Sequence, residues 1–478
     1  MSRINTNVTS LIAVGNLNKN NQALQTSLQR LSTGYRINSG KDDPAGLIAS
    51  ENLQAEQRAT ETAISNAQRA DSIIGTADGA LAEVSNLLVS LQGLVNNSAN
   101  KAGLSPEEQN ANQLQVDSIL STINRISNST SFEGVKLLNG TFDYTTSSVN
   151  TAQFTNVSVN AAQLAPGVTT TVNVGVTTSA QVGQLVYAGP ATLTTSSTIS
   201  VTGNAGSAQI TFNQGAVTAD IVAAINTYTD TTGVKALTSG GTTYFQSTAY
   251  GATQFVSVKA SSAEFTTNDR NNVNAATTGS GQDVVLSVNG TKVTGTGLAA
   301  HAVVAGADID LTLNSLADTQ GNTLTFGITG GGATFSIGSQ VSAASEASIG
   351  IRTVDTVHLG AQLNGSTLVT LADLGSGKSA ALNTGDVTLA QQIVSQAIKD
   401  VSGLRGRLGA FQSNVLGSTI NSLNVADQNI QSSNSAIRDT NFASETANLT
   451  RSQILVQAAT SVLSTANSSP QAILKLLG

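Results

Sequence analysis

The stretch AISNAQRADSIIGTADGALAEVSNLLVSLQGLV, residues 63–95, sets the fold of the helical part of the chain. Small and aliphatic residues recur along it at alternating steps of four and three residues, without an error. They are Ala63, Ala67, Ala70, Ile74, Ala77, Leu81, Val84, Leu88, Leu91 and Val95. This alternation is the heptad pattern of a coiled coil. It predicts one helix from near Pro44 to Ala99, roughly 80 Å long at about 1.5 Å per residue.

Upstream of this helix, residues 1–33 have the spacing of an amphipathic helix, interrupted only by an Asn-rich middle. Its apolar positions follow steps of three, four or seven residues: Ile4, Val8, Leu11, Val14, Leu17, Leu24, Leu28 and Leu31. The far end of the chain mirrors this arrangement, with a second seam at Ala390, Val394, Ala397, Val401, Leu404, Leu408, Phe411 and Val415. A last helix presents Leu449, Val456 and Leu463, with Leu455, Val462, Ile473, Leu474 and Leu477 beside them. We therefore expect the two ends of the chain to be helical partners.

The middle of the chain has a different composition. Residues 144–219 contain no Asp, Glu, Lys or Arg and are rich in Thr, Ser, Val and Gly. Short alternating runs, such as TTTVNVGVTT at 169–178, predict strands, with one helix near residues 219–226. The expected fold class is therefore α+β and multidomain. Its N- and C-terminal segments form an α-helical coiled-coil chassis, with a mostly β central insertion.

Between the two N-terminal helices lies RLSTGYRINSGKDDPAGL, residues 30–47, which gathers charge in a chain that is only 11% charged. Gly34, Gly40 and Pro44 predict that the helix breaks here. The polar side chains of interest are Arg30, Arg36, Asn38, Lys41, Asp42 and Asp43. A catalytic acidic pair, an ion site and an assembly joint are the alternatives. Two adjacent carboxylates without a second acidic cluster make a weak cation site, so pairing with Arg36, Lys41 or a neighbouring subunit is favoured.

The composition argues against several classes of function. The chain has 478 residues, no Cys, no Trp and two His, and its net charge of −7 argues against a nucleic-acid partner. No stretch approaches the ~20 apolar residues of a membrane helix, so we expect no membrane insertion. The segments GSGKS at 375–379 and GTGLAA at 295–300 lack the context of a nucleotide site, and His301 and His358 are isolated. The sequence thus predicts no enzyme, and no catalytic, cofactor-binding or metal-binding residues.

Two terminal segments are more informative: LQRLSTGYRINSGKDDPAGLIASENL at 28–53 and SAIRDTNFASETANLTRSQILVQAATSVLSTANSSPQAILKLL at 435–477. They resemble the N- and C-terminal signatures of bacterial flagellin. SFEGVKLLNG at 131–140 also matches a family element, and one of the few departures is Tyr35, where Leu is usual. More faintly, residues 210–260 resemble the ββαββ "IN" module of flagellins and hook-associated proteins, whose named pair would be Ile225 and Asn226.

The resemblance implies a structural subunit that polymerises head to tail into the bacterial flagellar filament for swimming motility. It also implies a secreted, extracellular protein that is exported unfolded without a cleaved signal. The implied partners are other copies of the chain, the flagellar export apparatus, an export chaperone and the filament cap, and no cofactor is implied. The implied division is an inner tube of 1–40 and 437–478, an outer tube of 41–142 and 336–436, and a surface insertion at 143–335 that includes the IN-like module. The apolar residues of the terminal helices are then assembly residues, and the charges at 30–47 give directional contacts to neighbours.

Many flagellins are detected by an innate immune receptor through the first long helix and its partner. The matching segment here is LLVSLQGLVNNSAN, residues 87–100, in which Leu94 fits the family pattern. Ser90 stands where recognised members carry Arg, and Gln115 where they carry Glu. Because the loss of an Arg anchor removes much of the affinity of an interface, we expect weak or absent detection.

Three alternatives stay open from the sequence. A hook–filament junction protein has the same ends but makes a short ring. A surface adhesin uses the β insertion to bind a ligand. The charged break is, in the simplest alternative, a solvated linker, since exposed charges often contribute little.

Overall fold

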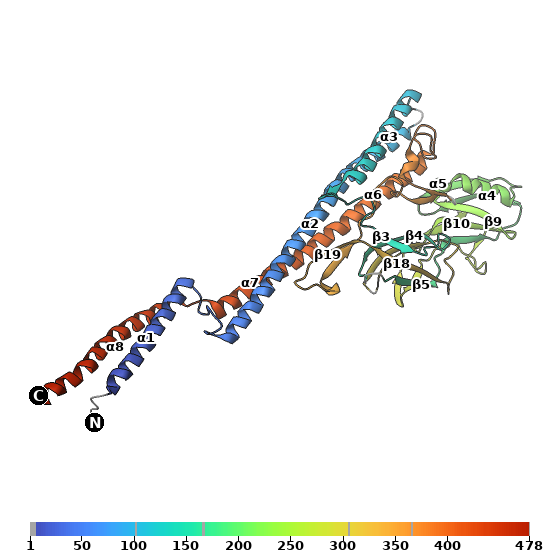
Figure 1. Cartoon of the computed structure of the whole chain (residues 1–478). Coiled ribbons are helices and arrows are strands. Elements are labelled where there is room, and N and C mark those ends of the chain that lie inside the picture. The colour runs from blue at the N-terminus through green and yellow to red at the C-terminus, as the bar shows by residue number, and fades with distance from the viewer. Residues whose placement is uncertain (1–5, 101–102, 165–167, 305, 365–366, 478) are drawn as a thin grey trace. The chain divides into compact units, whose positions relative to one another are not determined.

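The computed structural model describes residues 6–100, 103–164, 168–304, 306–364 and 367–477 (Figure 1). In Figure 1 the blue and red ends of the chain are helical, and the green and yellow middle is mostly strands. The predicted α+β fold class is therefore confirmed. The chain forms two compact units, one with residues 1–71, 336–345 and 413–478 and the other with residues 72–335 and 346–412.

The first unit contains a pair of helices from the two ends of the chain, α1 (Val8–Thr33) and α8 (Phe442–Leu477). Asn7 is the N-cap of α1, and its side chain accepts a hydrogen bond from the N–H of Ser10, which satisfies one free donor of the first turn. α1 ends at Gly34, whose φ of +77° is the left-handed conformation that glycine adopts without strain. Helix α7 (Ser418–Arg438) precedes α8.

Helix α2 (Pro44–Ser98) is one uninterrupted helix of 55 residues. All ten of its predicted seam positions at 63–95 are at most 1% exposed. The heptad pattern therefore predicted both the extent of the helix and its buried face. Pro44 stands in the first turn, where its missing N–H removes no hydrogen bond.

Two more helices complete the helical part of the second unit, α3 (Pro106–Ser129) and α6 (Val387–Ala410). An ion pair joins α6 to α2, because Arg405 Nε donates to Asp78 Oδ1 at 2.9 Å. The start of α3 is fixed by a capping box, in which Ser105 and Glu108 each accept a hydrogen bond from the other's backbone N–H.

The predicted seam of α6 is confirmed as far as Phe411 and is wrong at its last position. The turn Phe411–Gly417 is a π-helix, η4. A π turn takes one more residue per hydrogen-bonded ring than an α turn, so the register of the buried face moves on by one residue. Leu416 is therefore fully buried in place of Val415, which is only half-buried.

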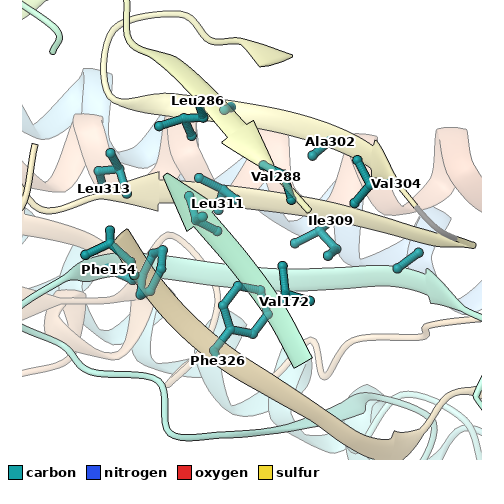
Figure 2. Packing of buried hydrophobic residues seen from close by; sticks show 14 of the residues in the cluster. Phe154, Val172, Leu286, Val288, Ala302, Val304, Ile309, Leu311, Leu313 and Phe326 are labelled. Atoms are coloured by element: carbon teal, nitrogen blue, oxygen red, sulfur yellow. The ribbon is translucent and has the colours of Figure 1, made fainter. Parts of the chain in front are cut away.

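The inner part of the insertion has two sheets, with strand orders β15-β14-β5-β18-β3 and β16-β17-β4. The strands are β3 (Tyr144–Ser147), β4 (Phe154–Ala162), β5 (Thr170–Thr178), β14 (Val285–Val288), β15 (Thr291–Thr294), β16 (Ala299–Val304), β17 (Ala307–Leu313) and β18 (Thr323–Gly331). Residues of both sheets share one hydrophobic core (Figure 2), in which the rings of Phe154 and Phe326 meet edge to face at 5.6 Å. We call this part the inner sandwich.

A second β module lies between β5 and β14 in sequence, with strand orders β12-β6-β10-β9 and β13-β11-β7-β8. Its elements are β6 (Val182–Tyr187), β7 (Ser197–Thr202), β8 (Ser207–Phe212), α4 (Thr218–Thr227), α5 (Thr229–Thr232), β9 (Val234–Ser239), β10 (Thr242–Tyr250), β11 (Phe255–Ala260), β12 (Thr267–Asn268) and β13 (Thr278–Ser280). Helix α4 is the helix expected near residues 219–226. Ile225 is fully buried, and the Asn226 side chain donates to the carbonyl of Ala236 and accepts from its N–H, at 2.9 and 2.7 Å, which fastens α4 to β9.

Short hairpins and turns connect these parts. They are β1 (Ser131–Phe132) with β2 (Val135–Lys136), β19 (Ala333–Ser336) with β20 (Glu346–Ile349), β21 (Gln362–Asn364) with β22 (Thr367–Val369), η2 (Ala343–Ser345) and η3 (Leu371–Leu374). The β1–β2 turn has Glu133 at φ +48° and Gly134 at φ +85°, the paired positive values of a tight two-residue hairpin.

Candidate assembly site

Helices α1 and α8 lie side by side and antiparallel in the first unit (Figure 1). Three contacts fix their register: Asn7 Nδ2 donates to the Ala466 carbonyl (2.8 Å), Asn20 Nδ2 donates to the Leu455 carbonyl (3.4 Å), and Arg30 Nη1 lies 3.7 Å from Glu445 Oε2. Chain positions more than 400 residues apart in sequence are thus held together along the pair. The two ends of the chain are partners, as their matching patterns predict.

The predicted apolar residues of this pair divide into two groups. Leu24, Leu31, Leu449, Val456 and Leu463 are half-buried. Val8, Leu11 and Leu28 are exposed, with Leu11 63% exposed. Ile4 lies outside the described residues, and the side chains of Ile473, Leu474 and Leu477 in α8 are likewise outside the description. Pairing within one chain therefore covers only part of the apolar surface.

Further exposed apolar residues on the same pair were missed by the sequence analysis: Ile12, Phe442 and Ile454. Ile12 is 60% exposed and directly follows Leu11, so it falls outside the predicted series, which steps from Val8 to Leu11 and on to Val14. A helix that is apolar on more than one face is a helix that packs against more than one partner. That signal was present in the sequence, as adjacent apolar residues at 11–12 and 454–456.

The charged break at 30–47 lies against the connection between α7 and α8. Backbone hydrogen bonds run from the N–H of Arg36 to the Arg438 carbonyl (2.7 Å) and from the N–H of Thr440 to the Gly34 carbonyl (2.8 Å). Tyr35 lies between them, and the Arg438 guanidinium sits 4.5 Å from the centre of its ring. The residue that departs from the family pattern thus makes a cation–π contact.

Arg30 and Arg36 of the break connect it to the end of α7 and to the first turn of α8. Arg30 Nε donates to the Arg36 carbonyl (3.1 Å) while its Nη1 pairs with Glu445. Arg36 pairs with Asp43 (Nη1–Oδ2, 3.6 Å) and donates from Nη2 to the Ile437 carbonyl (2.6 Å). Of the partners that the sequence left open for the acidic pair, Arg36 is the one that contacts Asp43.

The remaining polar residues order the loop before α2. Asp42 Oδ2 accepts hydrogen bonds from the Asn38 N–H and from the N–H and hydroxyl of Ser39, at 2.9–3.2 Å. These bonds, chiefly those from Ser39, hold the pKa of Asp42 below its usual range. Asn38 Nδ2 donates to the Tyr35 carbonyl (2.9 Å). Lys41 is exposed and has no partner among the residues that the structure describes.

The ion site, which the sequence left only as a weak alternative, has no support in the described part of the chain, which holds no group of three or more His, Cys, Asp or Glu side chains arranged for a metal ion. In the same part of the chain, no helix has both the length and the apolar character needed to cross a membrane. In the receptor-like segment, Ser90 and Gln115 are exposed and Leu94 is half-buried. The Ser90 hydroxyl donates to the Asn86 carbonyl of its own helix, at 3.0 Å.

Comparison with known proteins identifies the chain. A family model for the bacterial flagellin N-terminal helical region matches residues 4–143, and one for the bacterial flagellin C-terminal helical region matches residues 391–477. Over 99% of both chains, this protein is 31% identical to Flagellin D of Vibrio anguillarum. The chain belongs to the bacterial flagellins. It is also 30% identical to Flagellin B of Vibrio cholerae serotype O1 and 29% identical to Polar flagellin A of Vibrio parahaemolyticus, again over 99% of both chains.

This flagellin is therefore a structural subunit of the extracellular flagellar filament, and the predicted function is confirmed. Flagellins self-assemble into filaments, so other copies of the chain are its partners. Because the similarity to flagellins extends over the whole chain, the alternative interpretation as a hook–filament junction protein is not favoured.

Proposed function

We propose that this flagellin enters the filament through the α1–α8 pair, which buries its remaining apolar surface against neighbouring copies. The observation that carries this proposal is the exposure of Leu11 and Ile12 on α1 and of Ile454 on α8, in a chain whose other long helix buries its entire seam. Full burial of one such side chain contributes about 1.5–3 kcal/mol, so a few of them supply a substantial part of an interface. Val8, Leu28 and the half-buried residues of the pair belong to the same assembly surface, together with the terminal positions Ile4, Ile473, Leu474 and Leu477.

The joint at 30–47 has a different role in this proposal. Arg30, Arg36, Asn38, Asp42 and Asp43 set where α1 stops and α2 starts, and Lys41 is free to contact a neighbour. Exposed ion pairs contribute only ~0–1 kcal/mol each. Their value here is directional, because a charge placed against the wrong neighbour disfavours that packing.

The proposed division of the chain follows from where each part finds its core. Residues 1–40 and 437–478 form the inner tube, since few of their described residues are buried within the chain. Residues 41–142 and 336–436 form the outer tube around the buried α2 seam. Residues 143–335, with the IN-like module at 210–260, form a surface insertion that has its own hydrophobic cores and needs no neighbour for stability.

Export in an unfolded state suits the composition of this chain. Without Cys it forms no disulfides on the way, and with 4% aromatic residues it has little tendency to collapse early. The proposed partners in this step are the flagellar export apparatus, an export chaperone and the filament cap. The protein has no catalytic role in the proposal, which rests on the lack of a nucleophile–base set in the sequence.

Weak or absent detection by the innate immune receptor also remains a proposal. Its support is chemical: an exposed Ser90 and an exposed Gln115 present neither the positive nor the negative charge of recognised members. Addition of the purified protein to receptor-reporter cells tests it. Strong signalling at nanomolar dose contradicts it.

Seeded assembly tests the main proposal. Full-length protein is mixed with short filament fragments, beside a chain lacking residues 1–33 and 440–478, and the products are imaged by electron microscopy. Long filaments from the first and none from the second are expected. A chain lacking residues 150–330 is the matched control, because it removes more residues but leaves the terminal helices. Assembly by the terminally truncated chain, or short rings from the full chain, contradicts the proposal.

A further inference from the structure

The inner sandwich is attached to the helical part of its unit by charge rather than by a shared hydrophobic core. Neither of the two cores of the insertion includes a described residue of α2, α3 or α6. One aromatic contact, between Phe335 and Phe411 at 6.2 Å, lies at the strand β19 and not on the sheets of the sandwich. The sheet β16-β17-β4 instead meets α6 through polar side chains.

Arg407 of α6 is the centre of this contact. Its Nη1 lies 3.5 Å from Asp310 Oδ2 on β17, and the two side chains are only 28% and 43% exposed. Asn160 on β4 donates from Nδ2 to Asp310 Oδ2 (2.7 Å) and to Asp308 Oδ1 (3.0 Å). His301 on β16 completes the group, with Nδ1 2.8 Å from Asp310 Oδ1 and 3.5 Å from Asp308 Oδ1. We call these five residues the Arg407 cluster.

The chain enters and leaves the insertion beside this cluster. Asp143 precedes β3 on the way in and Arg352 follows β20 on the way out, and the N–H of Ile351 donates to the Phe142 carbonyl (2.9 Å), so the two connections run together. Burial raises the pKa of Asp143, although Arg352, His358 and Arg407 oppose this shift. Burial also lowers the pKa of Arg407, against the opposing charges of Asp310, Asp308 and Asp143. Charges of both signs are therefore held partly out of water around one helix residue.

The contact leaves several polar atoms without partners. Arg407 Nε, Asn160 Oδ1 and Ser158 Oγ are buried and form no hydrogen bond to any described residue. A buried polar atom without a partner destabilises the state that buries it. The contact between the sheet and α6 thus depends on a few charge pairs. Its polar atoms without partners can form hydrogen bonds to water when the sheet separates from the helix.

We propose that the Arg407 cluster is an ionic lock that holds the insertion on α6 and releases it to a second orientation when its charge pairs are weakened. The helical part and the two cores of the insertion keep their structure in both states, because no described residue of α2, α3 or α6 belongs to either core. Interfaces between parts of one chain that are polar in this way permit relative motion. The surface of the assembled subunit is then adjustable without any change in its helices.

A distance measurement between two spin labels tests the lock. The chain has no Cys, so Ser402→Cys on α6 and Lys292→Cys on β15, both at exposed positions, are unique labelling sites in the full-length protein. Pulsed electron paramagnetic resonance then gives the distribution of distances between helix and insertion. Arg407→Gln and Asp310→Asn each remove the central ion pair, one from the helix and one from the sheet. Arg405→Gln is the matched control, since Arg405 lies on the same helix and pairs with Asp78 of α2 instead.

The lock predicts a narrow distribution for the unsubstituted chain and for Arg405→Gln, and a broad or shifted one for Arg407→Gln and Asp310→Asn. The doubly labelled chain with all its charges intact provides a second test. Raising the salt from about 0.05 M to about 1 M shortens the screening length to roughly 3 Å and should broaden the distribution of distances. If both charge variants keep the narrow distribution of Arg405→Gln, the proposal is overturned. A distribution that does not change with salt overturns it as well.

Discussion

The α2 seam and the α1–α8 pair have nearly the same spacing of apolar residues but differ in how much of that apolar surface is buried within the chain. Every seam position of α2 at 63–95 is buried within the chain. In α1 only Ala13 and Ser27 are buried, although seven of the predicted apolar positions lie in this helix. The spacing of apolar residues therefore identifies a helix and its apolar face, but it does not show whether that face packs within the same molecule or against another copy.

The physical reason is the number of neighbours. In the second unit, which holds α2 from Ser72 onward, α2 contacts α3 through Ser98 and Asn112 and contacts α6 through Asp78 and Arg405, so this part of its seam has two helical neighbours. In the first unit α1 and α8 have chiefly each other, and two helices in contact can bury only one stripe each. The exposed stripes in a protein that forms filaments are the natural place for contacts between copies.

The largest effect is expected where the seam is complete. Leu88→Ala removes a fully buried side chain of α2, and such a cavity lowers the free energy of unfolding by about 2–5 kcal/mol. Val89→Ala, at the exposed next position, changes it by no more than about 0.5 kcal/mol. Urea unfolding followed by circular dichroism measures both. Equal effects of the two substitutions contradict the seam.

A smaller effect is expected at the joint. Arg30→Gln leaves the Glu445 carboxylate, whose side chain is nearly buried, without its ion-pair partner. The unpaired buried group destabilises the α1–α8 pair by about 1–3 kcal/mol. Loss of helical signal on heating should therefore begin at a lower temperature, and Arg30→Lys should restore much of it. A melting curve that matches the unsubstituted chain would show that this pair does not hold the helices.

The exposed stripe should affect assembly and leave the monomer alone. Leu11→Ala removes apolar surface that is free in the monomer, so monomer stability changes by no more than about 0.5 kcal/mol. If the side chain is buried between copies, the critical concentration for filament growth rises roughly tenfold, the equivalent of about 1.4 kcal/mol. Sedimentation of filaments after growth from seeds measures it. Leu114→Ala, an exposed leucine on α3, is the control and should not change it.

The smallest effect on stability is expected in the insertion, where a change should stay local because each β module has its own hydrophobic core. Glu264 accepts hydrogen bonds from the N–H groups of Thr194 and Thr195 and from the Thr195 hydroxyl, which lower its pKa from 4.5 to about 2. A carboxyl with a depressed pKa stabilises the fold above its ordinary pKa, and that stabilisation is lost as the pH falls from 4.5 towards 2. The protection of the 194–195 amides, measured as the exchange rate relative to an unstructured peptide at the same pH, should therefore fall over this range in the unsubstituted chain. Glu264→Gln should show low protection throughout, and parallel pH profiles of protection in the two chains would contradict the assignment.

Much of the helical architecture could be predicted because it depends on the spacing of apolar residues that are close in sequence. The extent of α2, the break at Gly34 and the seam of α6 up to Phe411 all follow from steps of three and four and from glycine. Val415 was predicted at a buried position held by Leu416, because a π turn changes the spacing and leaves no mark in the pattern of apolar residues.

The contacts between distant segments could not be predicted from one sequence. Nothing near Arg30 or Tyr35 indicates that Glu445 and Arg438 will face them. The strands of the insertion could be predicted from alternating runs of residues. The order of the strands within each sheet could not, because many Thr- and Val-rich runs can pair with one another in several registers. His301 and His358 lie at the surface as expected, but they are not isolated, since each has an aspartate oxygen within 2.8 Å.

Hydrogen exchange in the monomer and in the filament tests most directly whether the terminal helices complete their packing between copies. In the monomer, the amides of α1 and α8 should exchange rapidly and those along the α2 seam slowly, since few buried contacts protect the former. In the filament, α1 and α8 should become as protected as α2, while α2 itself changes little. Terminal helices that are already protected in the monomer, or that still exchange rapidly in the filament, would contradict assembly through the α1–α8 pair.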